Sequence, residues 1–243
     1  TQNLVAVMDG MSFYHYSQYS TIEHIKEQIA HYSYSDVGKV LFAVDYGHVT
    51  NFPSTVPGTR WMGSLENRIA SMTDFASTEY TWGEKQTFDT FRNFDACGIE
   101  PIANIAALTH SMGRKLDIMA RLGITSGVWP DPNNYVNAHP QFRQQLKDGT
   151  LIGKASYAYP EVRQFMLSII QDAATRFDID GVNLCFVRGP SLLLYEQPVI
   201  DAFIAAYGID PRQVSSTDSR LGTIRCTFIT PFVQSVRTML NNV

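Results

Sequence analysis

The segment of residues 178–210 constrains the fold most, because it places a buried strand, a polar cluster and a helix in immediate succession. Residues 181–187 are nearly continuously apolar and β-favouring, which is typical of a strand covered on both faces in a parallel sheet. Gly189 and Pro190 end this strand, and a helix with apolar residues at helical spacing follows. This order predicts an α/β fold, in which ligands bind at the carboxyl ends of the strands.

Three further segments are predicted as strands that precede helices, and they are residues 4–8, 40–44 and 101–107. Apolar residues at helical spacing, with caps or stop signals, predict helices over residues 21–30, 84–96, 160–173, 198–207 and 221–240, and a short one near 116–122. Either Ser20 or Thr21 can cap the first of these helices. Residues 223–229 could instead form a strand, because they are rich in β-branched residues, but we favour the helix. The long stretch between residues 49 and 83 is rich in Thr, Ser, Pro and Gly. We expect it to cover or build a site, because compact domains rarely keep long loops without a function.

The composition excludes several classes of protein. The chain has 243 residues with 44% hydrophobic and 17% charged residues, which predicts one globular α/β domain over residues 1–243. Its net charge of −4 and its dispersed Lys and Arg residues argue against nucleic acid, and no apolar run reaches the roughly 20 residues of a membrane span. Three cysteines at unrelated spacings and no paired histidines indicate neither a disulfide framework nor a metal cofactor. The start at Thr1 is compatible with a removed export signal.

Residues 155–183, ASYAYPEVRQFMLSIIQDAATRFDIDGVN, resemble the helix and fourth strand of the family-10-like glycoside hydrolases. The pair Tyr195-Glu196 and the later run of residues 207–211, YGIDP, resemble the continuation. The match covers the second half of the chain well and the first half only by layout. It implies a (β/α)8 TIM barrel that hydrolyses O-glycosidic bonds of a poly- or oligosaccharide.

Four predicted strand-helix units are half of the eight that a closed barrel requires. The chain therefore holds the first four βα units of an incomplete barrel, or it self-associates with a second half, or its sheet is open. We expect a domain that is incomplete at its C-terminus.

Glycoside hydrolysis usually needs two carboxyl groups, one as acid and one as nucleophile or base. Asp9 and Asp45 each follow a predicted strand, and Glu196 lies in the segment that resembles the family, so these three are the candidate catalytic residues. The alternative is that the aspartates initiate turns or cap helices and that Glu196 compensates a helix dipole.

Substrate-binding candidates follow from position and from residue type. Arg188 stands at the carboxyl end of the strand at residues 181–187, where its guanidinium can orient hydroxyls or a carboxylate. His110 is expected at the end of the predicted strand at residues 101–107. Aromatic residues make up 12% of the chain and can stack on sugar rings, and the candidates among them are Tyr46, Trp129 and Tyr195.

The fourth strand departs from the family pattern. Many related barrels carry a carboxylate there, whereas the inward positions here are Asn183, Cys185 and Val187. A non-catalytic carbohydrate-binding pseudoenzyme on the same scaffold is therefore the alternative function. Asp180 precedes the strand and is expected at the opposite end of the sheet.

Overall fold

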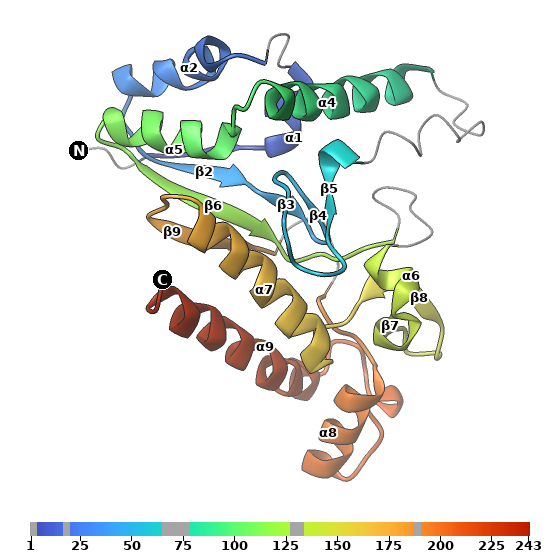
Figure 1. Cartoon of the computed structure of the whole chain (residues 1–243). Helices are drawn as coiled ribbons and strands as arrows, with labels where there is room; N and C mark the ends of the chain where they lie inside the picture. Colours follow the sequence, from blue (N-terminus) through green and yellow to red (C-terminus); the bar gives the residue numbers. More distant parts are fainter. Residues whose placement is uncertain (1–3, 17–19, 65–77, 127–133, 187–190) are drawn as a thin grey trace. The chain divides into compact units, whose positions relative to one another are not determined.

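The structure is a computed structural model, and it describes residues 4–16, 20–64, 78–126, 134–186 and 191–243. The chain divides into two compact units, Thr1–Arg121 with Asp172–Cys185, and Leu122–Gln171 with Phe186–Val243. Figure 1 shows the helices and strands of both units. Within the described ranges, no helix is long and apolar enough to cross a membrane.

The first unit is built on a four-stranded parallel sheet in the order β1-β2-β6-β9. The strands are β1 (Leu4–Met8), β2 (Val37–Ala43), β6 (Lys115–Arg121) and β9 (Gly181–Cys185). Three of the four lie where the sequence predicts strands, and the sheet runs in chain order. The protein is therefore a mixed α/β protein with a parallel sheet.

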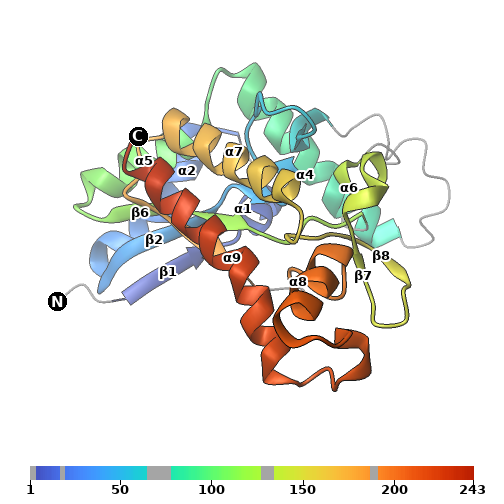
Figure 2. The ribbon, with the colours of Figure 1, turned by 90° about the horizontal axis from the view of Figure 1, so that it is seen from below.

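The register of this sheet separates two faces. Phe42 pairs with Met8 on one side and with Ile118 on the other, so these side chains share a face. Phe42 and Ile118 are fully buried there, and the Phe42 ring contacts the ring of Phe13 at 5.6 Å between centroids. On the opposite face of the edge strand β1, Val7 is 61% exposed. Figure 2 shows β1 at the edge of the sheet beside β2.

Helices cover the Phe42 face of the sheet. Figure 1 shows α2, α4 and α5 on the same side of the sheet. The helices of this unit are α1 (Gly10–Tyr16), α2 (Ile22–Ala30), α4 (Thr78–Ala96) and α5 (Pro101–Ser111), with short 3₁₀ turns at His31–Tyr34 and Met62–Ser64. Of the two residues predicted to cap α2, Ser20 and Thr21, the cap is Thr21, whose hydroxyl accepts a hydrogen bond from the His24 N–H.

The predictions for residues 101–107 and 116–122 were wrong, because the first segment is helix α5 and the second is strand β6. Glu100 caps α5 by accepting from the Ala103 N–H, Pro101 occupies the first turn, and alanines favour the helix. In β6, the fully buried residues Leu116, Ile118 and Ala120 recur at every second position, and the positions between them include the charged Asp117, which is the period of a strand.

A small sheet follows β2 and is formed by β3 (Asp45–Tyr46), β4 (Val49–Thr50) and β5 (Arg60–Trp61). Gly47, with φ of 77°, makes the turn between β3 and β4, and Asp45 Oδ1 accepts from its N–H. β3 lies beside the end of β6, because the Arg121 N–H donates to Asp45 Oδ1.

The second unit holds a hairpin and several helices. The hairpin strands are β7 (Arg143–Gln145) and β8 (Leu151–Ala155), and the helices are α6 (Tyr135–Ala138), α7 (Pro160–Arg176), α8 (Gln197–Tyr207) and α9 (Ser219–Leu240), with 3₁₀ turns at Pro140–Phe142 and Pro211–Gln213. Helix α7 ends inside the first unit, from Asp172 onward. The predicted helices at residues 160–173, 198–207 and 221–240 are confirmed.

Candidate functional site

Three polar side chains from three successive strand ends meet in the first unit. Asp9 follows β1, Tyr46 lies in β3 just after β2, and Arg121 is the last residue of β6. The Tyr46 hydroxyl donates to Asp9 Oδ1 at 2.8 Å, and an Arg121 Nη donates to Asp9 Oδ2 at 2.9 Å. We call Asp9, Tyr46 and Arg121 the strand-end cluster.

The cluster is held by rings as well as by hydrogen bonds. The Arg121 guanidinium lies over the Tyr46 ring, 4.3 Å from its centroid, and gains a cation–π contact. Its side chain is mostly buried, while that of Asp9 is 30% exposed. Asp9 is thus a carboxylate that is held by two side chains and still reaches solvent.

The chain after Asp9 must pass very close to β2 to place this carboxylate. A Cβ on Gly10 would lie 2.2 Å from Asn51 Nδ2 and 2.5 Å from the Ala43 carbonyl oxygen, so only glycine fits. The Asn51 amide in turn donates to that Ala43 oxygen at 2.8 Å. Gly10 therefore allows α1 to start directly above the end of β2.

Asp45 contacts the backbone of the cluster residue Arg121 and is fully buried. Its Oδ1 accepts from the N–H groups of Gly47 at 3.1 Å and Arg121 at 2.8 Å. Burial raises the pKa of Asp45 to about 7, although these two N–H groups and the Arg121 charge act in the opposite direction. Asp45 joins the turn after β3 to the last residue of β6, and so it holds Arg121 in place.

Glu196 and Tyr195 belong to the second unit, and both are buried. Glu196 Oε1 accepts from the N–H groups of Gln145 at 3.1 Å and Leu194 at 3.0 Å, and Oε2 accepts from Leu194 at 2.8 Å. Burial raises the pKa of Glu196, and these N–H groups lower it. The Tyr195 ring lies under the Arg225 guanidinium at 5.4 Å. These contacts attach the loop before α8 to strand β7.

His110 lies at the amino-terminal ends of the strands, opposite to the strand-end cluster. It is in the last turn of α5, and its Nε2 is 2.9 Å from Asp180 Oδ2 while its Nδ1 is 3.3 Å from Asp178. Asp180 also accepts from the Leu116 N–H at the start of β6. The expected position of Asp180 is confirmed. His110 does not lie at the carboxyl end of a strand, because residues 101–111 form helix α5.

Arg188 and Trp129 lie outside the described residues. Cys185, at the end of β9, is buried in an apolar cluster with Leu41, Ala43 and Met119. Among the described residues, no group of three His, Cys, Asp or Glu side chains is placed to hold a metal ion.

Sequence reasoning missed Arg121. The signal was present, because a residue at the end of a parallel strand faces the ligand-binding edge. The sequence pattern does not single it out, because it predicts a helix over residues 116–122 and therefore no strand end at Arg121.

The fold and the strand-end cluster define an α/β protein whose polar site lies at the carboxyl ends of the strands of a parallel sheet. Among solved structures, the chain resembles alpha-L-fucosidase isoenzyme 2 from Paenibacillus thiaminolyticus, with a TM-score of 0.60 and 12% sequence identity. The match covers 98% of this chain and 30% of that chain, and at this identity it shows the fold alone. No protein-family model and no curated protein matches the sequence.

Proposed function

We propose that this chain forms the first four β/α units of a (β/α)8 barrel of glycoside hydrolase type. The strand order β1-β2-β6-β9 follows the chain, as in such barrels, and helices cover one face of the sheet. The edge strand β1 exposes Leu4, Val5 and Val7, which suits a sheet that further strands adjoin. The likeness to a fucosidase, of which the chain spans 30%, supports the same view.

The proposed activity is hydrolysis of an O-glycosidic bond in an oligo- or polysaccharide. The observation that carries this proposal is the strand-end cluster, in which Asp9 accepts from Tyr46 and Arg121 and still reaches solvent. A neighbouring guanidinium favours the ionised form of a carboxylate, so Asp9 suits attack on the anomeric carbon or activation of water better than proton donation.

Asp45 and Glu196 enter this proposal as positioning residues. A pKa of about 7 suits a general acid, but Asp45 is fully buried and its Oδ1 is occupied by two backbone N–H groups. Glu196 is also buried and holds Leu194 and Gln145. Arg188, Tyr195, His110 and Trp129 stay predictions for the binding of substrate.

The test is turnover of a panel of nitrophenyl glycosides, beginning with the α-L-fucoside, by the wild-type chain and by Asp9→Asn. We expect Asp9→Asn to lower kcat by about a hundredfold or more, which is the usual effect of losing a catalytic carboxylate. Asp178→Asn removes the same charge at the opposite edge of the sheet, where the side chain is 89% exposed, and should leave kcat unchanged. Equal turnover by wild type and Asp9→Asn would remove Asp9 from the reaction.

One observation favours a second candidate function, a carbohydrate-binding protein without catalysis. Of the three predicted catalytic carboxyls, only Asp9 reaches solvent, whereas hydrolysis usually needs two. Under this alternative, wild type binds oligosaccharides in calorimetry without cleaving any glycoside. Asp9→Asn would then weaken binding, because the sugar hydroxyls lose a charged acceptor.

A further inference from the structure

The first unit has a hollow with a volume of about 230 Å³. Its lining residues do not include Asp9, Tyr46 or Arg121 of the strand-end cluster. It lies where α4 ends and α5 begins. The side chains that matter here are Asn51, Trp61, Phe91, Phe94, Asp95 and Glu100.

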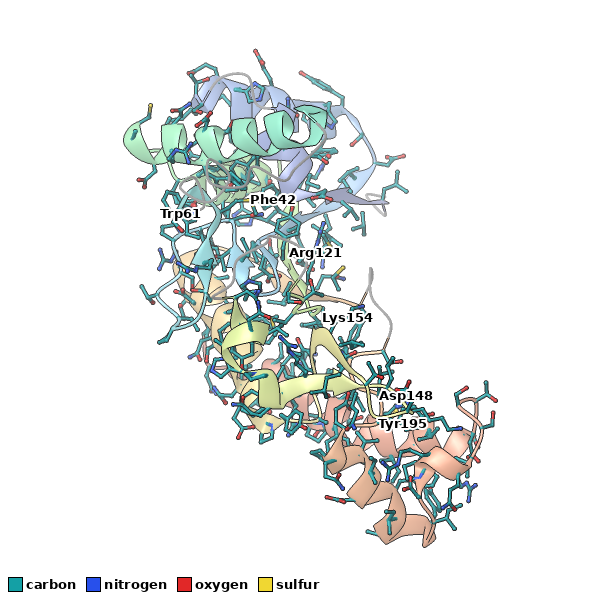
Figure 3. All side chains as sticks on the ribbon, turned by 90° about the vertical axis from the view of Figure 1, so that its right-hand side faces the viewer. Phe42, Trp61, Arg121, Asp148, Lys154 and Tyr195 are labelled. Atoms are coloured by element: carbon teal, nitrogen blue, oxygen red, sulfur yellow. The ribbon has the colours of Figure 1, made fainter. Side chains whose placement is uncertain are left out.

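Aromatic rings form the apolar part of its wall. Phe91 and Phe94 are buried, while Trp61 in β5 is half-buried; Figure 3 labels Trp61 near helix α4. Gly63 packs against the indole so closely that a Cβ there would lie 2.5 Å from the ring. The indole is therefore held by the backbone, and it offers a fixed aromatic surface to a ligand.

The polar part of the wall accepts hydrogen bonds. Glu100 and Asp95 contribute carboxylates, and burial raises the pKa of Glu100 to about 7 while the Ala103 N–H and the Arg176 charge lower it. The Arg176 guanidinium is itself 3.3 Å from Asp172. Asn51 is buried, and its Oδ1 accepts no hydrogen bond within the described part of the chain. An unpaired buried acceptor of this kind destabilises the folded protein unless a bound ligand donates a hydrogen bond to it.

Several donors on the same wall are already engaged. The N–H groups of Gly98 and Ile99 donate to the carbonyl oxygens of Asp95 and Phe94, each at 2.9 Å. The Asn51 amide donates to Ala43, and the lining residues Pro53 and Pro101 have no N–H. The carbonyl end of the long helix α4 adds a partial negative charge at this point.

We propose that this hollow is a binding site for a small protonated amine with a flat apolar body. The ammonium group would donate to Glu100 and to Asn51 Oδ1, with Asp95 adding charge, and the body would lie against Trp61. A neutral sugar gains less from this wall, because its hydroxyls carry no charge to pair with the Glu100 and Asp95 carboxylates. This site does not depend on the glycosidase proposal.

Benzylamine and benzyl alcohol test the proposal, because they share a shape and differ in charge. The whole chain is titrated with each compound at about pH 8, above the pKa of Glu100, and the Trp61 indole N–H resonance is followed by NMR. Trp61→Phe assigns that resonance. We expect benzylamine to shift it and to bind about tenfold more tightly than benzyl alcohol, which corresponds to about 1.4 kcal/mol.

Variants separate this site from general attraction of cations. Glu100→Gln and Asp95→Asn should each weaken benzylamine binding several-fold, and Asp95→Asn leaves the Glu100 cap of α5 in place. Glu27→Gln removes the same charge as Glu100→Gln from a side chain that is 77% exposed on α2, and it should bind like wild type. Equal binding of the two compounds, or equal weakening by Glu27→Gln, would overturn the proposal, as would tighter binding of glucose than of benzylamine.

Discussion

Replacing Asp45 with Asn should stabilise the folded protein at about pH 8 and destabilise it at about pH 4. The carboxyl is fully buried, and its pKa rises from 3.8 to about 7 on folding. A group whose pKa is higher in the folded state favours folding while it is protonated. In wild type this contribution is complete below pH 3.8 and is lost as the pH rises through about 7.

The size of the effect follows from the shift in pKa. A shift of about three units corresponds to about 4 kcal/mol of lost stability at about pH 8. Asn keeps an oxygen for the N–H groups of Gly47 and Arg121, but its NH₂ replaces Oδ2, which is buried without a partner among the described residues. An unsatisfied buried donor costs about 1 to 3 kcal/mol. The net gain at about pH 8 is therefore about 1 to 3 kcal/mol, and a loss of similar size remains at about pH 4.

Urea denaturation followed by circular dichroism at both pH values measures the free energy of unfolding. Asp178→Asn serves as the control, because its exposed carboxyl has little influence on stability at either pH. If Asp45→Asn is less stable than wild type at about pH 8, the ionised carboxylate is stabilised by Arg121, and our reasoning about its burial is wrong.

Further predictions concern His48, two glycines and Tyr46. His48 is buried and its pKa falls from 6.5 to about 4, so wild type should lose about 3 kcal/mol relative to His48→Phe as the pH falls through this window, measured by urea denaturation. Gly10→Ala should lower the free energy of unfolding by about 1 to 3 kcal/mol, because its Cβ would overlap Asn51 and the Ala43 carbonyl. Gly222→Ala, in the exposed interior of α9 with no atom near the new Cβ, should instead raise it by about 0.5 to 1 kcal/mol. Tyr46→Phe removes the hydrogen bond that the Tyr46 hydroxyl donates to Asp9 and should lower glycoside turnover or binding about tenfold without loss of the folded state, which circular dichroism would check.

Sequence patterns predicted elements best where two signals agreed. At α2, a capping residue precedes an apolar stripe, and in the structure Thr21 is the cap while Ile25 and Ile29 are buried. At residues 101–107, β-favouring isoleucines competed with alanines and a proline, and the decisive signal was the Glu100 side chain that caps the helix. A glutamate is an unusual cap, so its role was visible only in the folded chain.

The candidate site was predictable in part. The rule that strands deliver polar residues at their carboxyl ends indicates Asp9 and Asp45, the stacking of aromatic rings on sugars indicates Tyr46, and the structure brings Asp9 and Tyr46 together. Which carboxyl reaches solvent was beyond that rule, because burial depends on neighbours from distant parts of the chain. Asp45 accepts a hydrogen bond from the Arg121 N–H, and Glu196 accepts one from the Gln145 N–H. No local sequence pattern predicts such bonds.

The sequence by itself determined the class of the fold, because strand periods, helical stripes and their Gly and Pro stops are local and repeat along the chain. The tertiary structure alone decided which polar groups meet. Arg121 and Asp9 are 112 residues apart, and Tyr46 and Asp9 are 37 apart, so only the parallel register of β1, β2 and β6 joins them. Local physics sets the elements, whereas the contacts of a site arise from the packing of the whole unit.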